Sequence, residues 1–106
     1  MKKDTFYICV REPESKKIVA EKVSGYSEGD IGLHKTADGW RTTHIPTGNK
    51  VISQTFKTAK LALAAAKGIT THEGENFDKR IQEVFEGDAY KAFSKSRYEQ
   101  TVTTVF

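Results

Sequence analysis

The fold of this chain depends most on one stretch, DGWRTTHIPTGNKV, residues 38–51, which contains the single Trp and one of three His residues. Ala-Asp-Gly at 37–39 and Pro-Thr-Gly-Asn at 46–49 are turn sequences, because Asp, Asn and Gly tolerate the positive φ of tight hairpins. Two turns this close together predict a meander of three antiparallel strands over residues 31–35, 40–45 and 50–56.

The faces of this meander depend on its register. A three-residue Ala-Asp-Gly loop with a left-handed Gly39 would place Leu33 opposite Thr43 and Ile31 opposite Ile45, on the face toward the helices. The other face must then meet water or a partner, and it would carry His34, Trp40, Thr42 and His44. A slip of one residue would exchange the two faces.

Two further strands are expected before the meander. Residues 5–11 alternate apolar and more polar side chains, which is the period of a half-buried strand. A polar turn after Glu12-Pro13 leads into a second strand over residues 17–23. The next segment should be a flexible connection without the G-x-G-x-x-G spacing of a phosphate loop, and it is marked by Gly25, Gly29 and Gly32.

Helical signals begin after Phe56. Thr58 is placed as the N-cap of an Ala-rich helix that Gly68 should end. A second helix should run from Asn76 to Gly87. Its apolar residues share one stripe, which we expect to be buried against the sheet: Phe77, Ile81, Val84 and Phe85.

Asp88 should cap a third, shorter helix, and the β-branched residues within 99–105 predict a closing strand. Strands followed by helices define an α+β fold, here an antiparallel sheet of four to five strands with two to three helices packed on one face. With 106 residues and 37% apolar composition, the chain should form one domain over residues 1–106. The sequence leaves open whether the protein is a monomer or a homodimer, and whether residues 88–106 pair within the chain or across a dimer.

Composition narrows the class of protein. Cys9 is the only cysteine, so no intrachain disulfide can form, and the N-terminus lacks the apolar run of a signal peptide. No segment approaches the roughly 20 apolar residues of a membrane span. We therefore expect a cytoplasmic protein with no membrane association.

Charge is distributed unevenly along the chain, although the net charge is only +3. Basic residues dominate residues 25–70, and acidic residues dominate residues 71–87. This polarity suits a protein partner of complementary charge as well as a phosphate backbone, so nucleic acid is permitted but not required.

Neither a metal site nor a catalytic site is predicted. The residues with suitable ligands, Cys9, His34, His44 and His72, form no close pair such as C-x-x-C, so we expect no metal and no other cofactor. Pairing of His44 with Cys9 or Asp38 could support catalysis, but such residues occur in most domains of this size. A strand histidine that bonds a neighbouring Thr or carbonyl is the favoured interpretation of His44, and the protein should not be an enzyme.

Two kinds of partner fit the expected open face. Trp40 and Tyr26 could stack on the bases of single-stranded nucleic acid while basic side chains follow the phosphates. Trp, Tyr and Arg also dominate protein interfaces, and a protein partner is the favoured interpretation. With Trp40 as the anchor, the predicted partner-binding residues are Tyr26, His34, Lys35, Trp40, Arg41, His44 and Lys50.

The segments GWRTTHIPTGNKV and FKTAKLALAAAKGI resemble a pattern in small proteins of phages and prophages of low-GC Gram-positive bacteria. The resemblance covers residues 33–69. It implies a mobile-element setting, in which small non-enzymatic proteins block host machines, anti-CRISPR and other anti-defence inhibitors among them. We expect an inhibitor that occupies a host protein or nucleoprotein surface; the alternative is a single-stranded nucleic-acid-binding module that uses an aromatic and basic sheet face.

Overall fold

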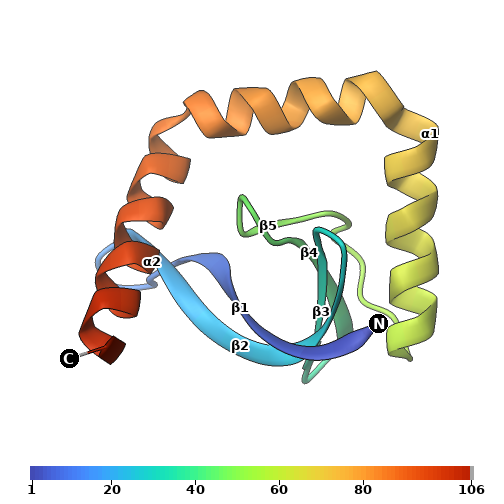
Figure 1. The fold of residues 1–106 in the computed structure, drawn as a ribbon, viewed down its shortest axis with the longest axis horizontal. Coiled ribbons are helices and arrows are strands. Elements are labelled where there is room, and N and C mark those ends of the chain that lie inside the picture. Colours follow the sequence, from blue (N-terminus) through green and yellow to red (C-terminus); the bar gives the residue numbers. More distant parts are fainter. Residues whose placement is uncertain (106) are drawn as a thin grey trace.

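The computed structural model describes residues 1–105, with side chains for residues 1–102, and these residues form an α+β fold (Figure 1). Five strands form one antiparallel sheet in the order β1-β2-β3-β4-β5, and both helices pack against it. The elements are β1 Lys2–Arg11, β2 Ile18–Glu28, β3 Ile31–Thr36, β4 Gly39–His44, β5 Asn49–Lys50, α1 Ala59–Glu86 and α2 Asp88–Val105.

The sheet is curled, and its two ends meet. β1 and β2 form a long bent hairpin that crosses beneath the rest of the sheet (Figure 1). On the outer edge of β1, the backbone N–H of Cys9 donates to the carbonyl of Gly48 in the β4–β5 turn at 2.9 Å. The turn predicted at residues 46–49 therefore also ties the last strands to the first.

The β3–β4 hairpin closes with two residues, Ala37 and Asp38, and not with the expected three. Thr36 pairs with Gly39, and the hydroxyl of Thr36 donates to the Gly39 carbonyl at 2.9 Å. Gly39 has a φ of 135°, and a β-carbon there would lie 2.7 Å from the carbonyl oxygen of Phe56. Gly39 is therefore the first residue of the returning strand, since its missing side chain makes room for that backbone.

The shorter loop moves the register by one residue. Leu33 lies opposite Thr42, where the sequence predicted Thr43, and Ile31 lies opposite His44, where it predicted Ile45. Directly opposite residues share a face of an antiparallel sheet. The side chains that share the face of Ile31 and Leu33 are therefore those of Trp40, Thr42 and His44.

The main core lies between this face and the first half of α1. Leu33 is fully buried against Ala62 and Ala66 of the helix. Trp40 and Tyr26 pack against the same cluster as half-buried side chains, with ring centroids 5.8 Å apart. The prediction that Trp40 lies on an open face is thus wrong, because the register places it beneath α1.

The glycines expected in a flexible connection lie mostly in strands. Gly25 is in β2 and Gly32 in β3, and only Gly29, with a φ of 59°, lies in the turn between them. A β-carbon on Gly32 would lie 2.6 Å from the ring of Phe6. Gly32 thus allows the aromatic ring of β1 to lie directly on β3.

The last predicted strand of the meander is short. β5 contains only Asn49 and Lys50, and beyond it an isolated bridge pairs Phe56 with Trp40. The hydroxyl of Thr42 accepts from the backbone N–H of Ile52 at 3.1 Å. A side chain thus replaces the backbone partner here, and the predicted strand over residues 50–56 ends early.

α1 begins where predicted, because the Thr58 hydroxyl accepts from the backbone N–H of Leu61 at 3.1 Å. The helix passes through Gly68, however, and kinks at Gly74, whose φ of 34° and ψ of −108° are not helical. A glycine inside a helix lowers helix stability by only ~1 kcal/mol relative to alanine. The packing of α1 against the sheet outweighs this cost at Gly68. Gly87 ends the helix as expected.

α2 begins at Asp88 as predicted but continues to Val105, so the closing strand over residues 99–105 is wrong. Ser96 and Gln100, one helical turn apart, bond to the backbone of Ala20 on the free edge of β2. The Ser96 hydroxyl accepts from the N–H at 3.0 Å, and the Gln100 amide donates to the carbonyl at 2.5 Å. The helical spacing of these two side chains thus satisfies the backbone N–H and carbonyl of Ala20.

Neither helix of the described chain combines the length and apolar character that a membrane-crossing helix requires.

Candidate partner-binding pocket

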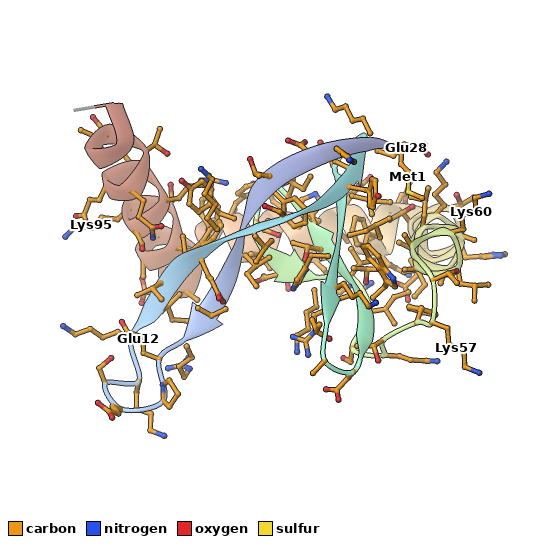
Figure 2. The ribbon with its side chains drawn as sticks, turned by 90° about the horizontal axis from the view of Figure 1, so that it is seen from below. Met1, Glu12, Glu28, Lys57, Lys60 and Lys95 are labelled. Atoms are coloured by element: carbon orange, nitrogen blue, oxygen red, sulfur yellow. The ribbon has the colours of Figure 1, made fainter. Side chains whose placement is uncertain are left out.

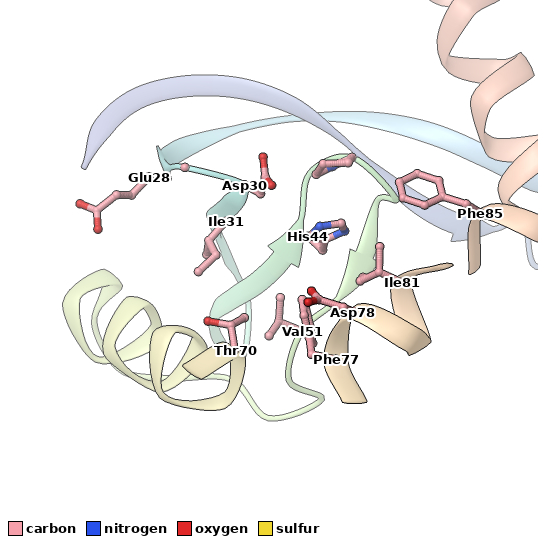
Figure 3. Close-up of a pocket in the computed structure, with 12 residues that line it drawn as sticks. Glu28, Asp30, Ile31, His44, Val51, Thr70, Phe77, Asp78, Ile81 and Phe85 are labelled. Carbon is pink, nitrogen blue, oxygen red and sulfur yellow. The ribbon is translucent and has the colours of Figure 1, made fainter. Parts of the chain in front are cut away.

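A cavity of about 520 Å³ lies between the second half of α1 and the turns at the ends of β2 and β4 (Figure 3). The first half of α1 fills the core, whereas the kink at Gly74 carries the second half across the top of the molecule (Figure 1). The cavity is therefore a consequence of the kink, because it lies where the helix stops following the sheet.

The walls of the cavity are mainly apolar. Ile31 and Val51 contribute from the sheet side, and the helix contributes Phe77, Ile81 and Phe85. The helix residues belong to the stripe that we expected to be buried against the sheet. That expectation is corrected: all of the stripe, Phe77, Ile81, Val84 and Phe85, is only half-buried, because the kinked helix stands off the sheet.

His44 contributes a polar atom to the wall of this cavity. Its ring is 9% exposed and meets the Phe77 ring edge to face, with centroids 5.9 Å apart. Nδ1 lies 2.9 Å from the hydroxyl of Thr47, which is itself 1% exposed. Among the described residues, no protein group bonds to His44 Nε2.

The contact between His44 Nδ1 and Thr47 fits both neutral tautomers of the ring. The Thr47 hydroxyl has one proton and lies 3.3 Å from the His44 carbonyl, which also accepts from the backbone N–H groups of Thr47 and Gly48. The same hydroxyl oxygen accepts from the backbone N–H of Asn49 at 3.3 Å. In one tautomer Nδ1–H donates to Thr47, and in the other the Thr47 hydroxyl donates to Nδ1.

His44 stays neutral near pH 7. Burial lowers the pKa of its ring, and the negative charge of Asp30 opposes this shift only in part. A neutral ring has one N–H donor and one acceptor nitrogen. The favoured interpretation of His44, a strand histidine bonded to a neighbouring Thr, is confirmed by the bond to Thr47.

Three carboxylates lie around the opening of the cavity. Glu28 is held by Lys67 and by the amino group of Met1, which lies beside it (Figure 2). These hydrogen bonds and charges lower the pKa of Glu28. Asp30 and Asp78 come from opposite walls, the β2–β3 turn and α1, and among the described residues neither has an ion-pair or hydrogen-bond partner for its carboxylate.

The structure separates the predicted partner-binding residues. Only His44 lines the cavity. Trp40 and Tyr26 are packed beneath α1, which also covers the sheet face expected to stack on nucleic-acid bases. The long cations lie elsewhere: Lys35 and Lys50 are exposed on β3 and β5, and Arg41 is half-buried on β4.

His34 and Arg41 are direct partners across β3 and β4, on the face opposite Trp40. His34 is 7% exposed and meets the ring of Phe6, with centroids 6.2 Å apart. Burial, and then the charge of Arg41, lower the pKa of His34. Among the described residues, neither His34 Nδ1 nor Arg41 Nε has a hydrogen-bond partner, although both atoms are buried.

The residues considered for catalysis are not assembled. His44 bonds to Thr47 and not to Cys9 or Asp38. Burial raises the pKa of the Cys9 thiol, which reduces its thiolate fraction. Among the described side chains, no group of three or more His, Cys, Asp or Glu residues is placed to hold a metal ion.

Exposed lysines lie at both ends of the described structure (Figure 2). Lys57 and Lys60 point outward near the start of α1, whereas Lys95 points outward from α2 at the opposite end (Figure 2). A phosphate backbone is followed by closely spaced cations. Lys95 is therefore not part of one cation track with Lys57 and Lys60.

Comparison of the chain with models of protein families, with curated proteins and with solved structures gave no match.

Sequence reasoning found the apolar stripe of the cavity but assigned it to the core, and it did not predict a role for Asp30 or Asp78. The available signal was the amphipathic pattern Phe77–Phe85 with an acidic residue beside Phe77. A pattern of this kind gives the face of a helix, but not its distance from the sheet.

Proposed function

We propose that this chain is a small, non-enzymatic, phage-type binding protein that inhibits a host or defence machine, as anti-CRISPR proteins do. It acts in the bacterial cytoplasm by occupying a protein surface, alone or within a nucleoprotein complex. The cavity beneath the second half of α1 is its contact site. The mechanism is steric and needs no cofactor.

The observation that carries this proposal is the apolar lining of the cavity. Phe77, Ile81 and Phe85 are half-exposed in a chain of 106 residues that has few fully buried large side chains. Apolar walls around an open concavity, with a polar rim, are typical of sites that receive a side chain of a partner. Covering them in a complex recovers about 25 cal/mol per Å² of apolar surface.

The first test is photo-crosslinking from the rim of the cavity. A benzoylphenylalanine replaces Gln82, an exposed residue one turn beyond Asp78 on α1, and a matched probe replaces Glu14 in the exposed β1–β2 turn. Both proteins are irradiated in a lysate of a Gram-positive bacterium, with and without nuclease. A nuclease-resistant protein adduct from position 82 and none from position 14 supports the proposal.

A blocking variant links the adduct to the cavity. Thr70 lines the cavity, and Thr70→Trp places an indole within it. The variant should fold, because Thr70 is a half-buried helix residue, and it should lose the adduct from position 82. An unchanged adduct in Thr70→Trp, or an adduct lost after nuclease treatment, would contradict contact through this cavity.

Inhibition is tested separately in cells. The wild-type protein is expressed in a Gram-positive strain with active CRISPR immunity, and the plating efficiency of a targeted phage is measured. The wild type should raise plating efficiency and Thr70→Trp should not. Equal plating with both proteins and with an empty vector would exclude anti-CRISPR action, and the crosslinked protein would then identify another host machine.

A further inference from the structure

Carboxylates are the charged groups that line the cavity. Asp30 and Asp78 contribute them from opposite walls, the β2–β3 turn and α1. The hydroxyl of Thr70 donates its proton to the carbonyl of Lys67 at 3.1 Å, so toward the cavity this oxygen can only accept. Within the described part of the chain, no Lys or Arg lines the cavity.

The charge of this site is negative. Glu28 is neutralised by Lys67 and the Met1 amino group, and Arg80, whose guanidinium lies 5.8 Å from the Phe77 ring centroid, is paired with Glu73. The charges of Asp30 and Asp78 have no such partner among the described residues. An occupant should therefore combine a cation that has several N–H donors with an apolar stem.

We propose that the cavity binds the side chain of an arginine on the surface of the partner protein. The guanidinium has five N–H donors in one plane, so it can reach acceptors on opposite walls, and its methylene stem can lie along apolar walls. A lysine ammonium is a compact, strongly hydrated charge that does not bridge acceptors in one plane. This inference rests on the proposed function and names the partner chemistry of the same site.

Phe77 strengthens the choice of arginine. Its ring lines the cavity and contacts the ring of His44, and Asp78, the next residue, lines the same cavity (Figure 3). A guanidinium stacks on an aromatic face while it bonds to a carboxylate at its edge. Arg80 already lies over this ring from outside the cavity, which demonstrates that the ring accepts a guanidinium.

Nuclear magnetic resonance titration of the isolated protein tests the chemistry directly. The probe is the capped tripeptide acetyl-Gly-Arg-Gly-amide, and its counterparts replace Arg by citrulline, lysine or norleucine. Agmatine serves as a free cation with the same head group. The arginine peptide should shift the resonances of Ile31, His44, Val51, Phe77 and Ile81, and the citrulline peptide should bind about tenfold more weakly, because it lacks the charge.

Variants then locate the charge effect. Asp78→Asn and Asp30→Asn should each weaken binding of the arginine peptide severalfold. The affinity of each variant for the peptide should also depend less on salt concentration than the affinity of the wild type does. Asp38→Asn is the matched control, because Asp38 is an exposed aspartate in the β3–β4 loop outside the cavity. Spectral dispersion checks that each variant is folded, and Asp30, in an exposed turn, provides the second test if Asp78→Asn is destabilised.

Several outcomes would overturn the inference. They are equal binding of the citrulline or norleucine peptide, shifts outside the cavity, no binding of any peptide, and tighter binding of agmatine than of the arginine peptide. The last result would identify a small free cation as the occupant. A crosslink from the rim without binding of the arginine peptide would reject this inference and leave the proposed function in place. Binding of the arginine peptide without a crosslink would reject the proposed function and leave the arginine-binding chemistry of the cavity in place.

Discussion

Gly48 lies directly against the ring of Phe93, and a β-carbon at Gly48 would lie 2.5 Å from Cζ of that ring. The same β-carbon would lie 2.9 Å from the backbone nitrogen of Cys9, which bonds to the Gly48 carbonyl. Phe93 is fully buried. One glycine thus joins the first strand, the β4–β5 turn and α2.

Gly48→Ala should therefore destabilise the fold by about 2 to 4 kcal/mol, through overpacking and through a φ of 72° that L-residues resist. Urea unfolding followed by circular dichroism measures the change. Gly29→Ala is the control: its φ is 59°, but no atom lies within 4 Å of the added β-carbon. Equal losses in the two variants would show that Phe93 does not press on Gly48.

Trp40→Ala should cost roughly 3 to 5 kcal/mol, because its ring packs against Tyr26 and the core beneath α1. The indole of the isolated protein should emit in the blue and be poorly quenched by iodide. Tyr98→Ala, at a ring that is 70% exposed, should change stability by less than ~0.5 kcal/mol. A red-shifted, readily quenched Trp40 would contradict the observed register.

Acidic pH should destabilise the fold through His34 and His44. Burial lowers the pKa of both rings, so the unfolded chain binds protons more readily. Their contribution to stability is present above the unfolded pKa of about 6.5 and is lost as pH falls through the lowered values. The thermal midpoint should therefore be lower at about pH 5 than at about pH 7.5.

His34→Leu should reduce that pH dependence, because it removes one buried ring and its unpaired Nδ1. His72→Gln removes an exposed ring instead and keeps both buried ones. Scanning calorimetry at several pH values compares the three proteins. A pH dependence that His34→Leu leaves intact and His72→Gln removes would contradict this assignment.

Gly68→Ala should raise stability by about 0.5 to 1 kcal/mol, because Gly68 is helical and no atom lies within 4 Å of an added β-carbon. Gly74→Ala should lower stability, since its φ of 34° at the kink disfavours a side chain. Thermal unfolding ranks the two variants. The opposite ranking would mean that α1 breaks at Gly68, as its sequence alone suggests.

The local features of this chain could be predicted because they depend on neighbouring residues. The hairpin at Glu12-Pro13, the N-cap at Thr58 and the helix end at Gly87 each follow from residues within one turn of the feature. The α+β class and the antiparallel meander follow from the order of these features.

The candidate site could be predicted only in part. The stripe Phe77–Phe85 is visible as an amphipathic pattern, and His44 was identified by its residue type. The cavity itself depends on the angle at Gly74 and on the distance between α1 and the sheet. Those quantities result from packing between distant segments, which a periodic pattern does not encode.

By itself, the sequence determined the order of strands and helices, the turns at 12–17 and 37–38, and the start of α1 at Thr58 and its end at Gly87, because backbone preferences and capping act within a few residues. Only the tertiary structure decided which side of each element is covered. One loop residue at Ala37-Asp38 reversed the face of Trp40, and contacts of Ser96 and Gln100 with Ala20 kept residues 99–105 helical. A strand has a period of two, so a slip of one residue exchanges buried and exposed faces, and only contacts between distant residues select the register.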